Sequence, residues 1–136
     1  MTTHNAIPPQ IAVIGCGHWG KNHVRNFHAL GALAAVTDAN ADLARTMSET
    51  YGVPIKDYAD ILADPAISGV VIAAPAEAHG ALATQALDAG KHVFVEKPLA
   101  LTVAEAEDVA PFQRTTEVAM ARCGTALCVA SATTRK

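Results

Sequence analysis

Short apolar runs alternate along this chain with longer stretches in which apolar and polar positions mix at helical spacing. The apolar runs have the length of buried strands and lie at residues 11–14, 32–37, 69–74 and 92–95. The mixed stretches predict helices at residues 21–30, 41–50, 58–63 and 78–89. A capping-box sequence from Thr102 to Glu105 predicts the start of a further helix. Strands and helices in this alternation predict an α/β fold with a doubly wound parallel sheet.

The regular pattern weakens towards the C-terminus. Pro111 falls inside the last expected helix and is predicted to break it, because proline removes a backbone donor and clashes one turn back. Residues 117–121 could form one more strand, and the polar residues 131–136 are expected to fray. The sequence therefore predicts one domain over residues 6–121 and a divergent tail over residues 122–136.

Composition excludes several classes of function. Apolar residues make up 51% of the chain but aromatic residues only 4%, so the core must consist of small aliphatic side chains. With a net charge of −3, the chain has no basic field for nucleic acid. No apolar run approaches the ~20 residues that span a bilayer, and the N-terminus does not resemble a signal peptide. We therefore expect a cytoplasmic protein without nucleic-acid or membrane partners.

Cysteine and histidine residues do not form a recognisable metal motif. The three cysteines lack a paired spacing, and the six histidines are scattered, so neither a metal site nor a disulfide framework is expected. Cys16 lies between two glycines, where any small residue would serve. The histidines, including His79 near the start of an expected helix, are interpreted as solvated or locally packed residues.

The first apolar run leads directly into a glycine-rich sequence, Gly15-Cys16-Gly17-His18-Trp19-Gly20. A tight turn at Gly15, a close backbone approach to a pyrophosphate at Gly17, and close helix packing at Gly20 would explain this spacing. Asp38 ends the second apolar run, where a carboxylate can accept hydrogen bonds from both hydroxyls of an adenosine ribose and repel a 2′-phosphate. These residues predict a dinucleotide site that prefers NAD to NADP.

Further candidate residues follow the third and fourth apolar runs. Ala74 and Pro75 come after the third run, and Glu96, Lys97 and Pro98 come after the fourth. Because the carboxyl ends of parallel strands share one edge of a sheet, we expect these residues to lie around the same crevice as the glycine-rich turn.

The segment Glu96-Lys97-Pro98-Leu99-Ala100, downstream of this glycine-rich fingerprint, resembles the Gfo/Idh/MocA family of NAD(P)-dependent sugar oxidoreductases. The resemblance runs from about residue 11 to residue 109 and implies a Rossmann-type fold. Within the family, residues 15–22 and 24–27 are most similar to the branch that oxidises nucleotide-linked hexosaminuronates at C3.

The resemblance implies roles for individual residues. Lys97 would lie beside the nicotinamide and the reacting hydroxyl as a catalytic residue, and Glu96 would contact the nicotinamide ribose. The Lys97–Pro98 bond is often cis in this family. The loop containing Ala74 and Pro75 would pack its backbone against the cofactor. His18 and Trp19 would lie in the phosphate loop, where their N–H groups matter more than their rings.

The family's C-terminal α/β substrate domain has no counterpart in these residues, so we expect a single cofactor domain. Two functions stay open. The chain could be the NAD-binding part of a sugar or nucleotide-sugar dehydrogenase, truncated and inactive alone, or a non-catalytic dinucleotide-binding or sensing module. A methyltransferase is disfavoured by the Glu96-Lys97-Pro98 segment. Surface normally covered by a second domain also favours a homo-oligomer.

Overall fold

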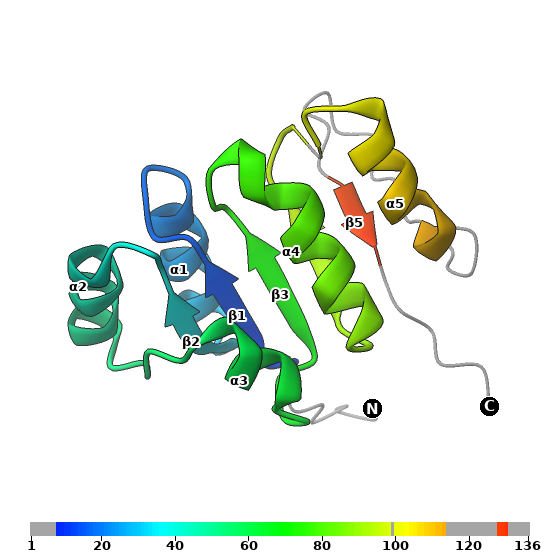
Figure 1. Cartoon of the computed structure of the whole chain (residues 1–136). Coiled ribbons are helices and arrows are strands. Elements are labelled where there is room, and N and C mark those ends of the chain that lie inside the picture. Colours follow the sequence, from blue (N-terminus) through cyan, green and yellow to red (C-terminus); the bar gives the residue numbers. More distant parts are fainter. Residues whose placement is uncertain (1–7, 99, 114–127, 131–136) are drawn as a thin grey trace.

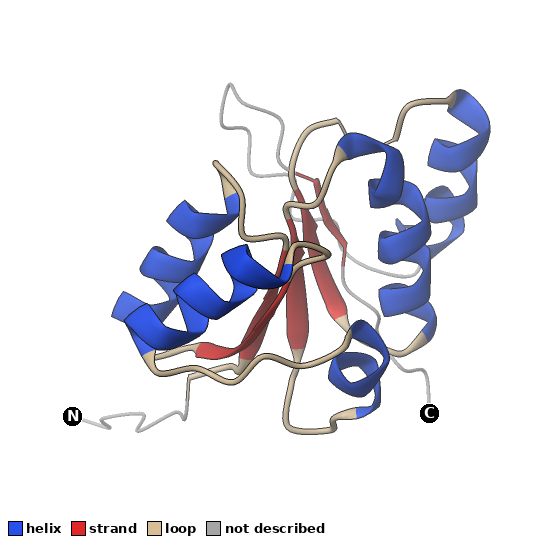
Figure 2. Cartoon of the chain, turned by 60° about the vertical axis from the view of Figure 1, so that its left-hand side comes forward, coloured by secondary structure: helices blue, strands red, loops and turns tan. Residues whose placement is uncertain are grey.

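A five-stranded sheet lies between two layers of helices (Figures 1 and 2). The computed structural model describes residues 8–98, 100–113 and 128–130. The strands are β1 (Ile11–Ile14), β2 (Leu33–Thr37), β3 (Gly69–Ile72), β4 (His92–Val95) and β5 (Cys128–Ala130). The helices are α1 (Gly20–Ala29), α2 (Ala41–Tyr51), α3 (Tyr58–Ala63), α4 (Ala76–Asp88) and α5 (Val103–Gln113).

The sheet has the strand order β2-β1-β3-β4-β5. Its first four strands are parallel, which confirms the predicted Rossmann-type arrangement. The fifth strand, β5, runs antiparallel to β4 and comes from the segment expected to be a divergent tail. Part of that tail therefore belongs to the sheet. The strand expected at residues 117–121 and the fraying expected at residues 131–136 lie outside the described residues.

Alternate strand residues supply two separate apolar cores. Ala12 and Ile14 of β1 face the α3 and α4 side, whereas Val13 faces the α1 and α2 side. All three are at most 5% exposed, as expected for central strands that are covered on both faces. Helices therefore cover both faces of the central strands, and the loops that follow the strands lie at the carboxyl edge of the sheet.

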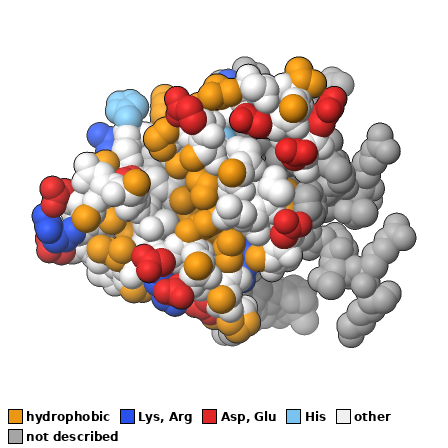
Figure 3. All heavy atoms as spheres, viewed as in Figure 1, with side chains coloured by type: hydrophobic (Ala, Val, Ile, Leu, Met, Phe, Trp, Pro, Cys, Tyr) orange, Lys and Arg blue, Asp and Glu red, His pale blue; other side chains and the backbone are white. Residues whose placement is uncertain are grey.

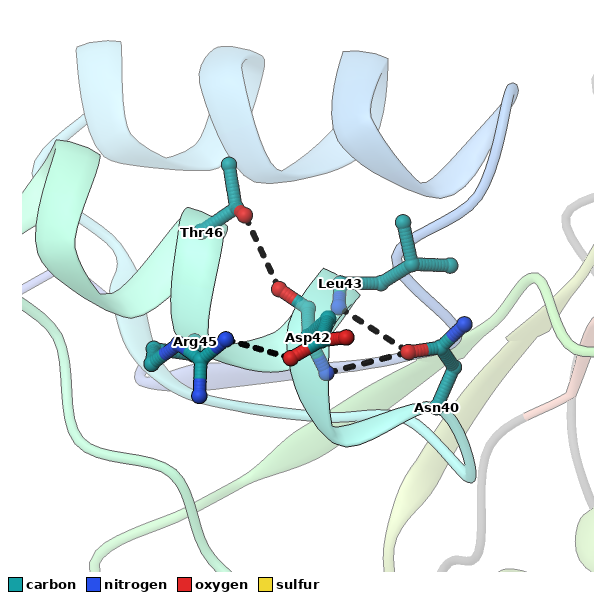
Figure 4. A network of polar contacts seen from close by, with 5 residues as sticks. All are labelled: Asn40, Asp42, Leu43, Arg45 and Thr46. Carbon is teal, nitrogen blue, oxygen red and sulfur yellow. Dashed lines mark hydrogen bonds and ion pairs between the residues drawn. The ribbon is translucent and has the colours of Figure 1, made fainter.

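Local capping signals set the helix boundaries. The Asn40 side chain accepts hydrogen bonds from the backbone N–H groups of Asp42, at 3.0 Å, and Leu43, at 3.4 Å, and so begins α2 (Figure 4). Thr102 likewise accepts from the Glu105 N–H at 3.2 Å at the start of α5. The Glu105 carboxylate reaches back to the Leu101 N–H at 3.0 Å, one residue before the capping-box position.

The predicted break at Pro111 is wrong, because α5 continues through this residue to Gln113. The fixed φ of proline is compatible with a helix, and both its missing N–H and the clash of its ring with the carbonyl group four residues earlier act locally. Pro111 lies in the last turn of α5 as described, with two described helical residues after it, so eight residues of the helix precede the disturbance. Within the described residues, none of the helices has the length and apolar character needed to cross a membrane.

Candidate functional site

The carboxyl ends of the four parallel strands bring the candidate residues to one edge of the sheet. Backbone hydrogen bonds continue the strand pairing into the loops, from the Gly15 N–H to the Thr37 carbonyl at 2.8 Å and from the Ala73 N–H to the Ile14 carbonyl at 2.7 Å. The Glu96 N–H donates to the Ile72 carbonyl at 2.9 Å. The loops after β1, β2, β3 and β4 are therefore adjacent, as the parallel topology predicts.

The three glycines of the turn meet different requirements. Gly15 has φ +98°, and a Cβ there would lie 2.6 Å from the backbone of Ala73. A Cβ on Gly20 would lie 1.8 Å from the Gly15 carbonyl oxygen, so Gly20 is required mainly by the turn itself and less by contact with the sheet. By contrast, a Cβ on Gly17 would meet no atom within 4 Å. Gly17 thus leaves an open cradle at the start of α1, where backbone N–H groups and the helix dipole favour an anion.

Asp38 connects the end of β2 to this turn. Its Oδ2 accepts a hydrogen bond from the Cys16 N–H at 2.6 Å, and its Oδ1 accepts from the Asn40 N–H at 2.6 Å. An ionised carboxylate has about four lone-pair sites, so these two bonds leave capacity for further donors. The backbone contacts thus orient the carboxylate at the turn without saturating it.

Cys16 is a buried, neutral residue within the turn. Its side chain is 3% exposed, and its Sγ lies 3.7 Å from the Thr37 carbonyl oxygen. Burial, with the Asp38 carboxylate as a smaller cause, raises the pKa of the Cys16 thiol to about 11. The thiolate needed for nucleophilic or redox chemistry is therefore disfavoured at neutral pH.

A cavity of about 540 Å³ opens between the loops after β1, β2 and β3. This volume lies within the range of roughly 300–1,000 Å³ that is usual for small-molecule sites. In the space-filling view, apolar side chains gather across the middle of the face that carries α3 and α4 (Figure 3). Gly15, Asp38, Ala74 and Pro75 all line the cavity, as expected, but Tyr58 and Leu82 were missed because helix-to-helix approach is not encoded locally. The full lining is Ile14, Gly15, Thr37, Asp38, Ala39, Asn40, Tyr58, Ala74, Pro75, Ala78 and Leu82.

The remaining candidate residues lie outside this cavity lining. Trp19 is 62% exposed at the N-terminus of α1, and its ring meets the His18 ring edge-on at a centroid distance of 5.3 Å. Lys97 is exposed, and the Lys97–Pro98 bond is cis, as the resemblance implied. Gly17, Gly20 and Glu96 also lie outside the lining.

Glu96 has a partner that the sequence analysis did not predict. Its Oε1 contacts Nε2 of His23 on α1, and both side chains are less than one-fifth exposed. The His23 ring also packs edge-on against Phe94 of β4, with ring centroids 5.4 Å apart. The interpretation of the histidines as solvated residues is therefore wrong for His23.

His79 is packed near the start of α4, as the sequence analysis interpreted it, but its hydrogen-bonding partners were not predicted. It is 2% exposed, and its two ring nitrogens contact backbone carbonyl oxygens in two different loops. Nδ1 lies 2.6 Å from the Pro98 oxygen, and Nε2 lies 2.6 Å from the Ala74 oxygen. The sequence offered one signal for these contacts: His79 lies in the first turn of α4, directly after the loop that contains Ala74 and Pro75.

Comparisons with known proteins agree with this geometry. The model of an oxidoreductase family with an NAD-binding Rossmann fold, Gfo/Idh/MocA, matches residues 10–122. The inositol 2-dehydrogenase/D-chiro-inositol 3-dehydrogenase of Shouchella clausii (strain KSM-K16) is 41% identical over 99 residues, which cover 68% of this chain and 29% of that protein.

Solved structures show the same relationship. UDP-N-acetylglucosamine 3-dehydrogenase from Acidithiobacillus ferrooxidans is 32% identical with a TM-score of 0.71, over 77% of this chain and 33% of that one. GenD2 from gentamicin A biosynthesis, solved in complex with NAD, is 29% identical with a TM-score of 0.72, over 80% of this chain and 32% of that one. Other similar structures hold NADP.

The chain spans about 30% of the length of the curated relatives that it matches. The matched part contains the glycine-rich turn, Asp38 and the Lys97–Pro98 segment. The open cradle at Gly17 and the oriented Asp38 carboxylate suit a dinucleotide. The chain therefore belongs to the Gfo/Idh/MocA oxidoreductase family and contains its NAD-binding Rossmann domain.

Proposed function

We propose that this chain is the cofactor domain of a dehydrogenase that transfers a hydride from a hydroxyl-bearing carbon of a sugar or nucleotide sugar to NAD. The observation that carries the proposal is the turn itself, in which Gly17 is open and Asp38 is hydrogen-bonded to the neighbouring Cys16 N–H. The N–H groups at the start of α1 would hold the pyrophosphate. Asp38 would accept hydrogen bonds from the adenosine ribose and repel the 2′-phosphate of NADP.

Lys97 is the proposed catalytic residue. Its side chain is exposed at the carboxyl edge, and it follows β4 directly after Glu96. When bound, NAD supplies the nicotinamide carbon that accepts the hydride. The Lys97 ammonium would stabilise the alkoxide character of the substrate oxygen as the carbon loses its hydride, or relay the hydroxyl proton. Glu96 would offer the nicotinamide ribose the carboxylate oxygen that does not contact His23.

The substrate proposal rests on the relatives' names and on the resemblance of residues 15–22 and 24–27. Inositol and UDP-N-acetylglucosamine dehydrogenases both act on hydroxyl groups of polyhydroxylated rings. A nucleotide-linked hexosaminuronate is the specific substrate that the resemblance favours. A cyclitol such as inositol is the alternative substrate, and both should be assayed side by side.

Calorimetric titration of the chain with NAD, NADP and S-adenosylmethionine tests the cofactor proposal. NAD should bind more tightly than NADP, and S-adenosylmethionine should show no binding. Asp38→Ala should weaken NAD binding by about 1.5–3 kcal/mol, the range for a charge-assisted hydrogen bond. Asp88→Ala removes the same charge at the far end of α4 and should leave the affinity unchanged. Equal wild-type affinities for NAD and NADP would contradict the role of Asp38.

A further inference from the structure

Two histidines approach the Lys97 segment, defined as residues 96–98, from opposite faces of the sheet. His23 belongs to α1, whose apolar residues pack into the core that contains Val13 and Val24. His79 belongs to α4, which packs against the other face through the core that contains Leu87. Figure 2 shows helices on both sides of the strands.

Each histidine holds a direct neighbour of Lys97. His23 contacts the Glu96 carboxylate on one side, and His79 contacts the Pro98 carbonyl oxygen at 2.6 Å on the other. The Lys97 side chain itself is exposed and forms no hydrogen bond or ion pair with the described part of the chain. An unrestrained lysine side chain carries about 2 kcal/mol of rotamer entropy. The direction of the Lys97 side chain therefore depends on how its two neighbours are held, Glu96 through its side chain and Pro98 through its backbone.

His79 also joins the Lys97 segment to the cofactor cavity. Its second ring nitrogen contacts the carbonyl oxygen of Ala74, which lines that cavity together with Pro75. The ring is 2% exposed, so water does not compete for these contacts. One buried side chain thus links the loop after β3 to the segment after β4.

We propose that His23 and His79 are positioning residues, which place the Lys97 segment against the nicotinamide half of the bound dinucleotide. This inference rests on the proposed function, because it requires that the glycine-rich turn and Asp38 hold the adenosine half. His23 acts through the Glu96 side chain, and His79 acts through the Pro98 backbone.

The test compares NAD with ADP, which lacks the nicotinamide half, in titrations followed by fluorescence of Trp19, the single tryptophan of the chain. His23→Ala and His79→Gln should lower the ratio of NAD to ADP affinity about tenfold, or 1.4 kcal/mol. His23→Gln keeps a donor at the Nε2 position and should restore the ratio. His79→Asn keeps a donor near the Nδ1 position, towards Pro98, and should also restore it.

His28→Ala is the matched control, because this residue lies at the other end of α1 and should leave the ratio unchanged. The inference would be overturned if His79→Asn and His79→Gln had the same ratio of NAD to ADP affinity. It would also be overturned if the histidine variants lost NAD and ADP affinity by the same factor. If the wild type binds neither ligand, the proposed function fails instead.

A measurement on the wild type avoids the risk that His79 variants do not fold. In nitrogen-15 spectra of the histidine rings, the His23 and His79 signals should differ between the ADP and NAD complexes, whereas the His28 signal should not. Identical His23 and His79 signals in both complexes would also overturn the inference.

Discussion

Single residues of the glycine-rich turn divide into those that the fold requires and one that it leaves free. Gly15 and Gly20 cannot accept a Cβ without a clash against backbone atoms. Gly17 has no positive φ, and a Cβ added to it would have no neighbour within 4 Å. Its glycine identity therefore has no structural cause in the free protein, and close approach of a ligand is a sufficient one.

Alanine substitutions at Gly17 and Gly20 should consequently change different properties of the protein, ligand affinity in the first case and stability in the second. Gly17→Ala should lower NAD affinity at least about tenfold with an unchanged melting temperature, because the new methyl group occupies the space of the pyrophosphate. Gly20→Ala should lower the free energy of unfolding by at least about 1–3 kcal/mol, because its methyl group overlaps the Gly15 carbonyl. Circular dichroism melts and calorimetry separate the two effects. Unchanged NAD binding in Gly17→Ala would show that the glycine-rich sequence forms a turn and does not contact the pyrophosphate.

The buried Cys16 thiol should make stability depend on pH in the alkaline range. Its pKa is raised from 9.0 to about 11, so the folded state disfavours the thiolate. The resulting stabilisation is fully present below pH 9 and is lost as the pH rises from 9 to about 11. The free energy of unfolding of the wild type, measured in urea, should therefore fall over this interval more steeply than that of Cys16→Ala. Parallel pH profiles of the two proteins would contradict this assignment.

At the scale of elements, caps and turns place the loops that build the site. Asn40 begins α2 through its side chain and, through its backbone N–H, also holds Asp38. Gly52 ends the same helix with φ +64°, the left-handed conformation that glycine adopts most readily. The position of the Asp38 carboxylate thus depends on where α2 starts.

Removing the Asn40 cap should destabilise the protein without removing the Asp38 contact. Asn40→Ala retains the backbone N–H but loses the side-chain acceptor, which should cost about 1 kcal/mol and lower the melting temperature by roughly 3–5 °C. Asn40→Asp keeps an acceptor at the cap and should melt close to the wild type. A wild-type melting temperature for Asn40→Ala would show that the cap contributes nothing.

At the scale of the whole molecule, one face of the sheet is only partly covered by described helices. Helices α1 and α2 contact β1 and β2 on this face. Beside them, a shallow apolar groove over β3 and β4 is lined by Ile11, Phe27 and Phe94 among others. Apolar surface of this kind favours association with another protein surface.

The chain assayed by itself should therefore bind NAD, self-associate and show no sugar dehydrogenase turnover. Positioning of the second reactant accounts for about 7–11 kcal/mol of a barrier, and the relatives are about three times as long as the matched segment. Light scattering over a dilution series measures association. Absorbance of NADH measures turnover with inositol and nucleotide sugars. Robust turnover by a monomer would contradict this expectation.

Local patterns in the sequence determined the elements and most of the turn chemistry. The alternation of apolar runs with helical stretches predicted the four parallel strands and the first four helices. Gly15 and Asn40 were predictable because a left-handed turn and a helix cap depend on one residue and its immediate neighbours. The convergence of Asp38 with the glycine-rich turn followed from parallel topology alone.

Tertiary structure alone decided the contacts between distant elements. His23 and Glu96 are 73 positions apart in the chain, and β5 joins β4 through only three residues. His79 reaches Pro98 because α4 packs on one face of β3 and β4, which no local pattern specifies. Sequence periodicity shows which side of an element is buried. Which polar groups meet there depends on how whole elements pack, and this is why the two histidines beside Lys97 were visible only in the folded chain.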